Sequence, residues 1–219
     1  MAEHNQDTSK GPHEGGPLIS SGAPLEAAKA AVVLVHGRGA TAENILGLTK
    51  YFEQPGIAYM APQATGNSWY PRSFLAPLEE NEPGLSSALR VIGDLVAGVE
   101  RHNIAADKVV LLGFSQGACL VLEFAARHAK RYGAVIALSG GLIGPAGTPR
   151  DYSGSLGGAP VFLGCGDMDS HIPVDRVHET TEVMRLLGAN VTERIYPSMG
   201  HGINEDELIF VRQLLESLA

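Results

Sequence analysis

Ser115 lies between two glycines in the stretch Gly113-Phe114-Ser115-Gln116-Gly117, where a short apolar run meets a segment with helical spacing. Gly-x-Ser-x-Gly at the junction of a strand and a helix is typical of a nucleophilic serine in a strained turn. The glycines are needed because such a turn packs too tightly for neighbouring side chains. We therefore predict that Ser115 is a nucleophile; the alternative is an ordinary structural turn.

A serine hydroxyl needs a general base, and the base needs an acid that orients it. In this architecture the order along the chain is serine, acid, histidine. His201 lies in a loop between the last predicted strand and the last predicted helix, and we predict that it is the base; the alternative is a helix-capping histidine. Asp167 and Asp169 both follow the preceding strand, and periodicity does not choose between them. His171, in the same loop, is an alternative base, but we expect it to lie near the site without that role.

An oxyanion hole requires backbone N–H groups directed at the developing alkoxide. The turn His36-Gly37-Arg38-Gly39 follows an early predicted strand, and Gln116 follows the serine. Taken alone, the glycine-rich turn would be a simple connection between a strand and a helix. Together with the other segments, it is predicted to supply the oxyanion hole with the N–H of Gln116.

The elements that must position these residues alternate along the chain. Short runs rich in Val, Ile and Leu are separated by segments of helical spacing, which predicts an α/β fold with a mostly parallel central sheet and helices on both faces. The predicted strands are 31–35, 57–61, 109–112, 134–138, 160–165 and 191–196, with 18–21 as an additional edge strand. The predicted helices are 42–52, 84–102, 116–127, 175–187 and 205–218.

The chain is expected to form one domain over residues 17–219, preceded by a disordered tail over residues 1–16 in which His4 and His13 are solvated. Two long loops, 62–84 and 139–159, begin at the C-terminal ends of predicted strands. Open α/β sheets bind ligands at that edge, so both loops are expected to border the site.

Composition excludes several classes of function. The net charge of −8 argues against nucleic acid or an anionic membrane surface as a partner. No apolar run is long enough to span a membrane, and no signal peptide is evident, so a cytoplasmic protein is expected. Cys119 and Cys165 are expected to be free and buried. No metal-ligand spacing is found, and neither a metal nor a cofactor is expected.

Four segments, "LVHGRGA", "GFSQGA", "GDMDSHIPV" and "MGHGI", together resemble the phospholipase/carboxylesterase family of the α/β-hydrolase superfamily, which includes the acyl-protein thioesterases and small bacterial carboxylesterases. The resemblance covers roughly residues 30–218. It implies an α/β-hydrolase fold, and no insertion is large enough for a separate cap domain. It also implies that Asp169 is the catalytic acid, that Asp167 is structural, and that the N–H groups of Arg38 and Gln116 form the oxyanion hole.

The segment "APQATGNSWY" resembles the part of that family in which a tryptophan lines the acyl pocket. Without a cap domain, the loop 62–84 must cover the site. The family often has a small apolar residue where this chain has Arg38, and we hypothesise that this arginine favours an anionic or polar substrate group. The residues expected to line an acyl channel are Trp69, Tyr70, Phe74, Leu75, Ile143, Met168 and Met199.

These observations predict a serine carboxylesterase that hydrolyses short to medium acyl esters through the triad Ser115, Asp169 and His201 and an acyl-enzyme intermediate. An acyl-protein or acyl-CoA thioesterase, or a lysophospholipase, would use the same triad. The non-enzymatic alternative is a receptor that keeps the hydrolase fold and binds its ligand without turnover. The expected partner is a small-molecule ester or thioester, and a homodimer is left open.

Overall fold

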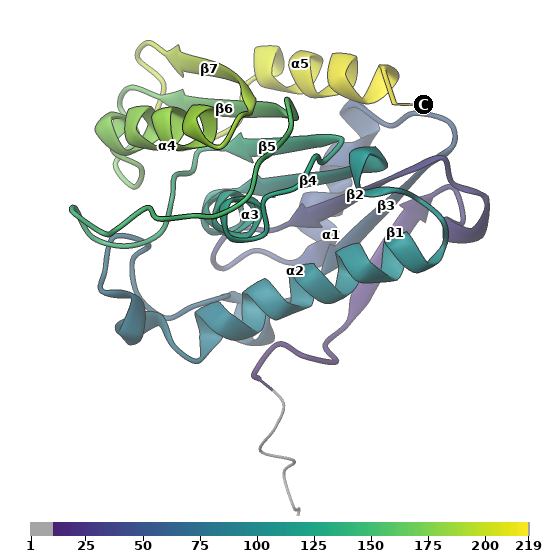
Figure 1. Cartoon of the computed structure of the whole chain (residues 1–219), viewed down its shortest axis with the longest axis horizontal. Helices are drawn as coiled ribbons and strands as arrows, with labels where there is room; N and C mark the ends of the chain where they lie inside the picture. Colours follow the sequence, from purple (N-terminus) through teal and green to yellow (C-terminus); the bar gives the residue numbers. More distant parts are fainter. Residues whose placement is uncertain (1–10, 219) are drawn as a thin grey trace, which may run out of the picture.

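The structure of the protein is a computed structural model that describes residues 11–218 (Figure 1). Within this range seven strands form a single sheet in the order β1-β3-β2-β4-β5-β6-β7, and only β1 is antiparallel to its neighbour. The predicted mostly parallel sheet and its additional edge strand are therefore confirmed. The strands are β1 (Leu18–Gly22), β2 (Ala30–Val35), β3 (Ile57–Pro62), β4 (Val109–Phe114), β5 (Ala134–Leu138), β6 (Pro160–Gly166) and β7 (Asn190–Tyr196).

Helices cover both faces of this sheet, as predicted (Figure 1). The helices on one face are α2 (Gly84–Arg101), α3 (Gln116–Arg127) and α4 (Val174–Leu186), and those on the other are α1 (Ala42–Leu46) and α5 (Glu205–Glu216). The helix predicted over 42–52 is shorter than expected, because α1 gives way to a 3-10 turn at Gly47–Tyr51. Glycine disfavours the helical backbone, which accounts for the change at this position.

The core consists of two apolar layers separated by the sheet. Strands β2, β3 and β5 are buried along their whole length. Because side chains alternate along a strand, Val33 of β2 packs with α2–α4 while Val32 packs with α1 and α5. No helix in the described part of the chain is long and apolar enough to cross a bilayer. Cys119 and Cys165 are buried and free, as predicted.

His13 is held in the folded structure, so the prediction that it is a solvated tail residue is wrong. Its side chain is only 5% exposed. Its Nδ1 accepts a hydrogen bond from the Thr65 N–H at 3.2 Å, so Nε2 carries the proton and donates to the Trp69 carbonyl at 2.8 Å. Its backbone N–H donates to the Ser87 hydroxyl at 3.0 Å. These partners lie far along the chain, and no local pattern could have revealed them.

The remainder of the predicted tail, residues 1–10 with His4, lies outside the described residues. The described part of that segment begins at Gly11 and leads through His13 into β1. A single domain over residues 17–219 stays a prediction.

Candidate active site

Ser115 occupies the sharp turn between β4 and α3, as predicted. Its φ of 56° and ψ of −119° lie in a region that L-residues rarely adopt. The turn is secured by its N–H, which donates to the Leu138 carbonyl at 2.9 Å. A Cβ at Gly113 would collide with the backbone of Gly117, and a Cβ at Gly117 would collide with the Val35 carbonyl. Both glycines are therefore required for the strained turn that exposes the serine hydroxyl.

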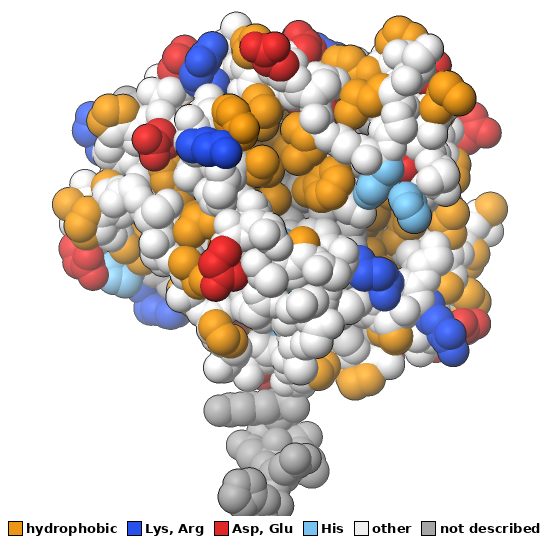
Figure 2. Space-filling view, turned by 180° about the vertical axis from the view of Figure 1, so that it is seen from behind, with side chains coloured by type: hydrophobic (Ala, Val, Ile, Leu, Met, Phe, Trp, Pro, Cys, Tyr) orange, Lys and Arg blue, Asp and Glu red, His pale blue; other side chains and the backbone are white. Residues whose placement is uncertain are grey.

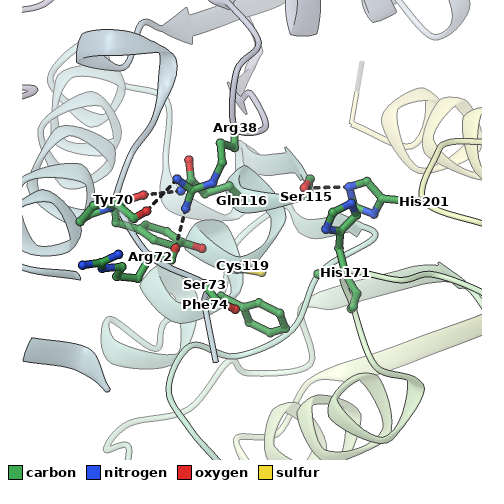
Figure 3. Close-up of a pocket in the computed structure, with 12 residues that line it drawn as sticks. Arg38, Tyr70, Arg72, Ser73, Phe74, Ser115, Gln116, Cys119, His171 and His201 are labelled. Atoms are coloured by element: carbon green, nitrogen blue, oxygen red, sulfur yellow. Dashed lines mark hydrogen bonds between the residues drawn. The ribbon is translucent and has the colours of Figure 1, made fainter. Parts of the chain in front are cut away.

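Ser115, His201 and Asp169 form a continuous chain of hydrogen bonds. His201 Nε2 lies 2.9 Å from Ser115 Oγ (Figure 3), and His201 Nδ1 lies 2.7 Å from Asp169 Oδ2. The other carboxylate oxygen of Asp169 accepts from the N–H groups of His171, at 2.8 Å, and Ile172, at 3.0 Å. The three side chains come from the C-terminal ends of β4, β6 and β7, which parallel pairing brings to one edge of the sheet.

The environment of Asp169 keeps its carboxylate ionised. Burial by itself raises the pKa of this group, but the hydrogen bond from His201 and the two backbone N–H groups outweigh burial, so the pKa lies below its usual value. A charged carboxylate on Nδ1 orients the imidazole and leaves Nε2 free to accept the serine proton.

Asp167 faces away from this chain of hydrogen bonds. One of its carboxylate oxygens accepts from the Ser198 N–H at 2.7 Å, which ties the β6 loop to the β7 loop. Asp167 is exposed, whereas the side chain of Asp169 is fully buried against His201. The geometry thus distinguishes the two aspartates that spacing along the chain leaves equivalent.

The loop that carries His201 is anchored on both sides. The Ser139 hydroxyl donates to the Gly202 carbonyl at 3.1 Å, and Asn204 caps the following helix with a reciprocal pair of hydrogen bonds to Glu207. The imidazole packs beside the ring of Phe114, with 5.1 Å between centroids. These contacts hold the His201 imidazole in a defined position beside Ser115.

The two N–H groups predicted to form an oxyanion hole lie beside Ser115. Neither the Arg38 N–H nor the Gln116 N–H donates a hydrogen bond to any described residue. A Cβ built on Gly37 would lie 3.2 Å from the Ser115 Cβ, so the Arg38 turn packs directly against the serine. In Figure 3, Arg38 and Gln116 lie on one side of Ser115 and His201 lies on the other.

Residues 63–83, between β3 and α2, form one wall of the site, which we call the pocket wall. The Gln116 side chain accepts from the Trp69 N–H at 2.8 Å and donates to the Tyr70 carbonyl at 2.8 Å. The indole N–H of Trp69 donates to the His36 carbonyl at 2.9 Å. The pocket wall is therefore attached directly to both segments that carry the candidate oxyanion hole.

A cavity of about 380 Å³ opens beside Ser115. Figure 2 shows apolar side chains gathered round a hollow, with a pair of histidines at its edge. The residues that line the cavity are Arg38, Tyr70, Pro71, Arg72, Ser73, Phe74, Ser115, Gln116, Cys119, His171, Ile172 and His201.

Of the residues predicted to line an acyl channel, only Tyr70 and Phe74 do so. Trp69 is fully buried behind the cavity, because its indole is hydrogen-bonded to the backbone of the Arg38 turn. Its role is to support the pocket wall, and the prediction that it contacts the acyl group is wrong in this structure.

The other predicted lining residues also lie outside the cavity. Ile143 is fully buried in the core, and Leu75 packs against that core. Met168 is 69% exposed, and the Met199 sulfur accepts from the Asn204 side chain at 3.2 Å. These residues lie in loops that border the site, but their position in the sequence did not predict whether their side chains face the cavity.

Six cavity residues were not predicted from the sequence as substrate contacts: Pro71, Arg72, Ser73, Cys119, His171 and Ile172. A signal existed for Cys119, since it lies four residues after Ser115 at the start of α3. His171 was expected only near the site, and its ring contacts that of His201 with 4.8 Å between centroids. No local pattern distinguished Arg72 from any other exposed arginine.

Several known proteins resemble this chain in sequence and in fold. A sequence model of the phospholipase/carboxylesterase family matches residues 19–219. Acyl-protein thioesterase 1 of Debaryomyces hansenii is 28% identical over 88% of the chain and 92% of that protein. A phospholipase/carboxylesterase structure from Dyadobacter fermentans is 44% identical with a TM-score of 0.88, over 91% of this chain and 96% of that one. The structure of esterase PE8 is 28% identical with a TM-score of 0.76, over 93% of this chain and 98% of that one.

Proposed function

Because the chain belongs to the phospholipase/carboxylesterase family and has the α/β-hydrolase fold, we propose that it is a serine carboxylesterase acting on short to medium acyl esters. Hydrolysis of an ester or thioester follows from the family. The identity of the catalytic residues and the substrate range are our proposal. The observation that supports it best is the unbroken chain of hydrogen bonds from Asp169 through His201 to Ser115.

In the acylation step, His201 Nε2 takes the proton of Ser115 as Oγ attacks the carbonyl carbon. The negative charge that develops on the carbonyl oxygen is stabilised by the Arg38 and Gln116 N–H groups, which have no acceptor among the described residues. His201 then donates its proton to the leaving oxygen or sulfur. Asp169 stabilises the imidazolium throughout, because its carboxylate stays ionised.

In the deacylation step, His201 takes a proton from water, and the resulting hydroxide attacks the acyl-enzyme. The same two N–H groups stabilise the second oxyanion. Collapse of this intermediate returns the proton to Ser115 Oγ and releases the carboxylic acid. The strained turn at Ser115 keeps the hydroxyl accessible for both steps.

The size and surface of the cavity support a short to medium acyl group. A space of about 380 Å³ accommodates a chain of modest length, and Phe74 and Ile172 provide apolar contact beside the nucleophile. No separate cap covers the site in the described part of the chain.

The experiment that tests this function is labelling with a fluorophosphonate, which reacts only with an activated serine. We expect stoichiometric labelling of Ser115 and none in Ser115→Ala. The control is Ser86→Ala on α2, whose hydroxyl donates to Glu82 on the protein surface and should not affect labelling. A wild-type protein that binds esters without being labelled would instead support the receptor alternative.

A thioesterase is the second candidate, because the relative from Debaryomyces hansenii carries that name and aligns with 88% of the chain. The proposed triad would act on either bond. Hydrolysis rates for oxygen and sulfur esters with the same acyl and leaving groups distinguish the two: an esterase retains much of its rate on the oxygen ester, whereas a dedicated thioesterase does not.

A cytoplasmic location and a homodimer remain predictions. Light scattering coupled to gel filtration tests the second, with a mass near 23 kDa indicating a monomer and twice that mass a dimer.

A further inference from the structure

We propose that the preferred substrates are esters whose acyl group ends in a carboxylate, that is, monoesters of linear dicarboxylic acids. This inference rests on the proposed function and specifies its substrate class. It is carried by the arginine-lined end of the cavity, formed by Arg38, Tyr70 and Arg72.

The charges around the cavity are all of one sign. The charge comes from two arginines, and no aspartate or glutamate lines the cavity, although the whole chain has a net charge of −8. The Arg72 side chain is exposed and has neither an ion pair nor a hydrogen bond with any described residue. An unpaired arginine at the mouth of a binding cavity is suited to hold a carboxylate through two parallel hydrogen bonds.

Arg38 adds a second positive charge, and it forms no ion pair with an acid in the described part of the chain. Its guanidinium donates to three neutral oxygens: the Ser68 hydroxyl at 3.0 Å, the Pro71 carbonyl at 3.0 Å and the Arg72 carbonyl at 2.5 Å. These bonds leave its charge uncompensated while they set the position of the backbone at Arg72. The sequence led to the hypothesis that Arg38 itself contacts an anionic substrate group. In the structure, Arg38 also holds the backbone of Arg72 in place.

Tyr70 provides a neutral donor at the same end of the cavity. Its side chain is buried beside the Cys119 thiol, and its hydroxyl has no oxygen or nitrogen partner among the described residues. Burial raises the pKa of Tyr70 well above its usual value, so the hydroxyl remains a donor. The Arg38 guanidinium lies 5.9 Å from the centre of this ring. The Cys119 sulfur beside this hydroxyl is only a weak acceptor, and the carboxylate of an anionic ligand would be a stronger one.

The position of these groups assigns the anion to the acyl part of the substrate. In the proposed mechanism His201 protonates the leaving group, which must therefore lie on the His201 side of Ser115. In Figure 3, Arg38, Tyr70 and Arg72 lie on the opposite side, with Phe74 and Cys119 between the two ends of the site. A methylene chain would contact this middle part, and a terminal carboxylate would reach the arginines.

The test compares three ethyl esters with the same six-carbon acyl chain, which differ only in the terminal group: monoethyl adipate (carboxylate), ethyl hexanoate (methyl) and ethyl 6-aminohexanoate (ammonium). Hydrolysis consumes water and yields ethanol and the free acid, so ethanol release measures all three. We expect kcat/KM for the adipate ester to exceed that for the hexanoate by about tenfold at low salt, with the aminohexanoate slowest. The preference should weaken as ionic strength rises.

Three variants connect this preference to the arginine-lined end. Arg72→Ala should reduce the adipate-to-hexanoate ratio at least several-fold, and Arg72→Lys should retain part of it. Tyr70→Phe, which removes only the hydroxyl, should also lower the ratio. The matched control is Arg101→Ala at the end of α2, an exposed arginine outside the cavity, which should leave the ratio unchanged.

The outcomes separate this inference from the proposed function. If wild type hydrolyses all three esters equally well and Ser115→Ala hydrolyses none, the proposed function stands and the acidic-acyl preference is wrong. The same conclusion follows if the ratio survives in Arg72→Ala. If Ser115→Ala retains wild-type ester hydrolysis, the proposed mechanism is wrong, and the substrate assignment loses its basis.

Discussion

The two sides of the active site are built in different ways. The proposed triad of Ser115, Asp169 and His201, which we call the catalytic edge, lies at the ends of strands that are paired within the sheet. The pocket wall of residues 63–83 contains no strand and only two short 3-10 turns. It is held instead by side chains from distant parts of the chain, chiefly His13, Arg38 and Gln116.

This difference indicates that the reaction chemistry is coupled to the fold, whereas the substrate range can vary. A change in the position of the catalytic residues would require changes in the paired strands themselves. A change in the pocket wall requires only the replacement of a few hydrogen bonds, so substrate range can diverge while the chemistry is retained. The predictions that follow test this contrast, from the largest expected effect to the smallest.

Replacement of Ser115 should abolish the chemistry without unfolding the protein. We expect Ser115→Ala to lower ester hydrolysis by about three to six orders of magnitude, because attack and proton transfer both depend on this hydroxyl. His201→Ala should behave in the same way, and the double variant should be no worse than either single one. Steady-state kinetics with a chromogenic ester measures the loss, and thermal unfolding checks the fold. Near-wild-type activity in Ser115→Ala would refute the assignment.

The two aspartates after β6 should differ sharply. Asp169→Asn replaces the charged partner of His201 Nδ1 and is expected to lower kcat by about four orders of magnitude. Asp167→Asn replaces a carboxylate acceptor with an amide oxygen that can still accept from the Ser198 N–H, and it should lower kcat less than about tenfold. The matched pair is compared on one substrate. A larger loss in Asp167→Asn would reverse the assignment of the acid.

Glu207 should couple the stability of the catalytic edge to pH. This glutamate is fully buried at the start of α5, behind the His201 loop, and one carboxylate oxygen has no partner among the described residues. Burial raises its pKa to about 7, so the folded state holds the proton that the unfolded state releases near pH 4.5. Its contribution to the free energy of unfolding is therefore present at low pH and is lost as pH rises through about 7.

Glu207→Gln tests this expectation, because a glutamine can cap the helix in the same way without ionising. Above pH 7 the variant should be more stable than wild type by about 3 kcal/mol at most, and the advantage should vanish near pH 5. Urea unfolding at the two pH values measures the difference. An advantage that does not depend on pH would show that ionisation of Glu207 is not its cause.

His13 provides the corresponding test on the pocket wall. His13→Ala removes hydrogen bonds to the Trp69 carbonyl and the Thr65 N–H, so the wall should loosen while the catalytic edge is unaffected. We expect KM to rise about threefold to tenfold with little change in kcat, and the protein to lose about 1–3 kcal/mol of stability. The control is His102→Ala, a surface histidine at the end of α2. A fall in kcat with unchanged KM would contradict the proposed separation of the two regions.

Local patterns in the sequence predicted the fold and two members of the catalytic edge, Ser115 and His201, whereas the choice of Asp169 over Asp167 came only from the family resemblance. The strained serine turn was predicted from Gly113 and Gly117, and the parallel sheet from the alternation of apolar runs with helical segments. His201 followed from its place after the last strand. These features can be predicted because the steric limits of a turn and the apolar pattern of a strand involve only a few neighbouring residues. Parallel pairing then fixes where each strand ends relative to the others.

The pocket wall was decided only by the tertiary structure. Trp69 was expected to contact the acyl group, but its bond to the His36 carbonyl turns it into the core, while Arg72 takes a place in the cavity. His13 was expected in solvent, but it finds partners more than fifty residues away. In a segment without regular structure, no periodicity dictates the direction of a side chain. That direction depends on which distant donors and acceptors the rest of the fold brings within reach.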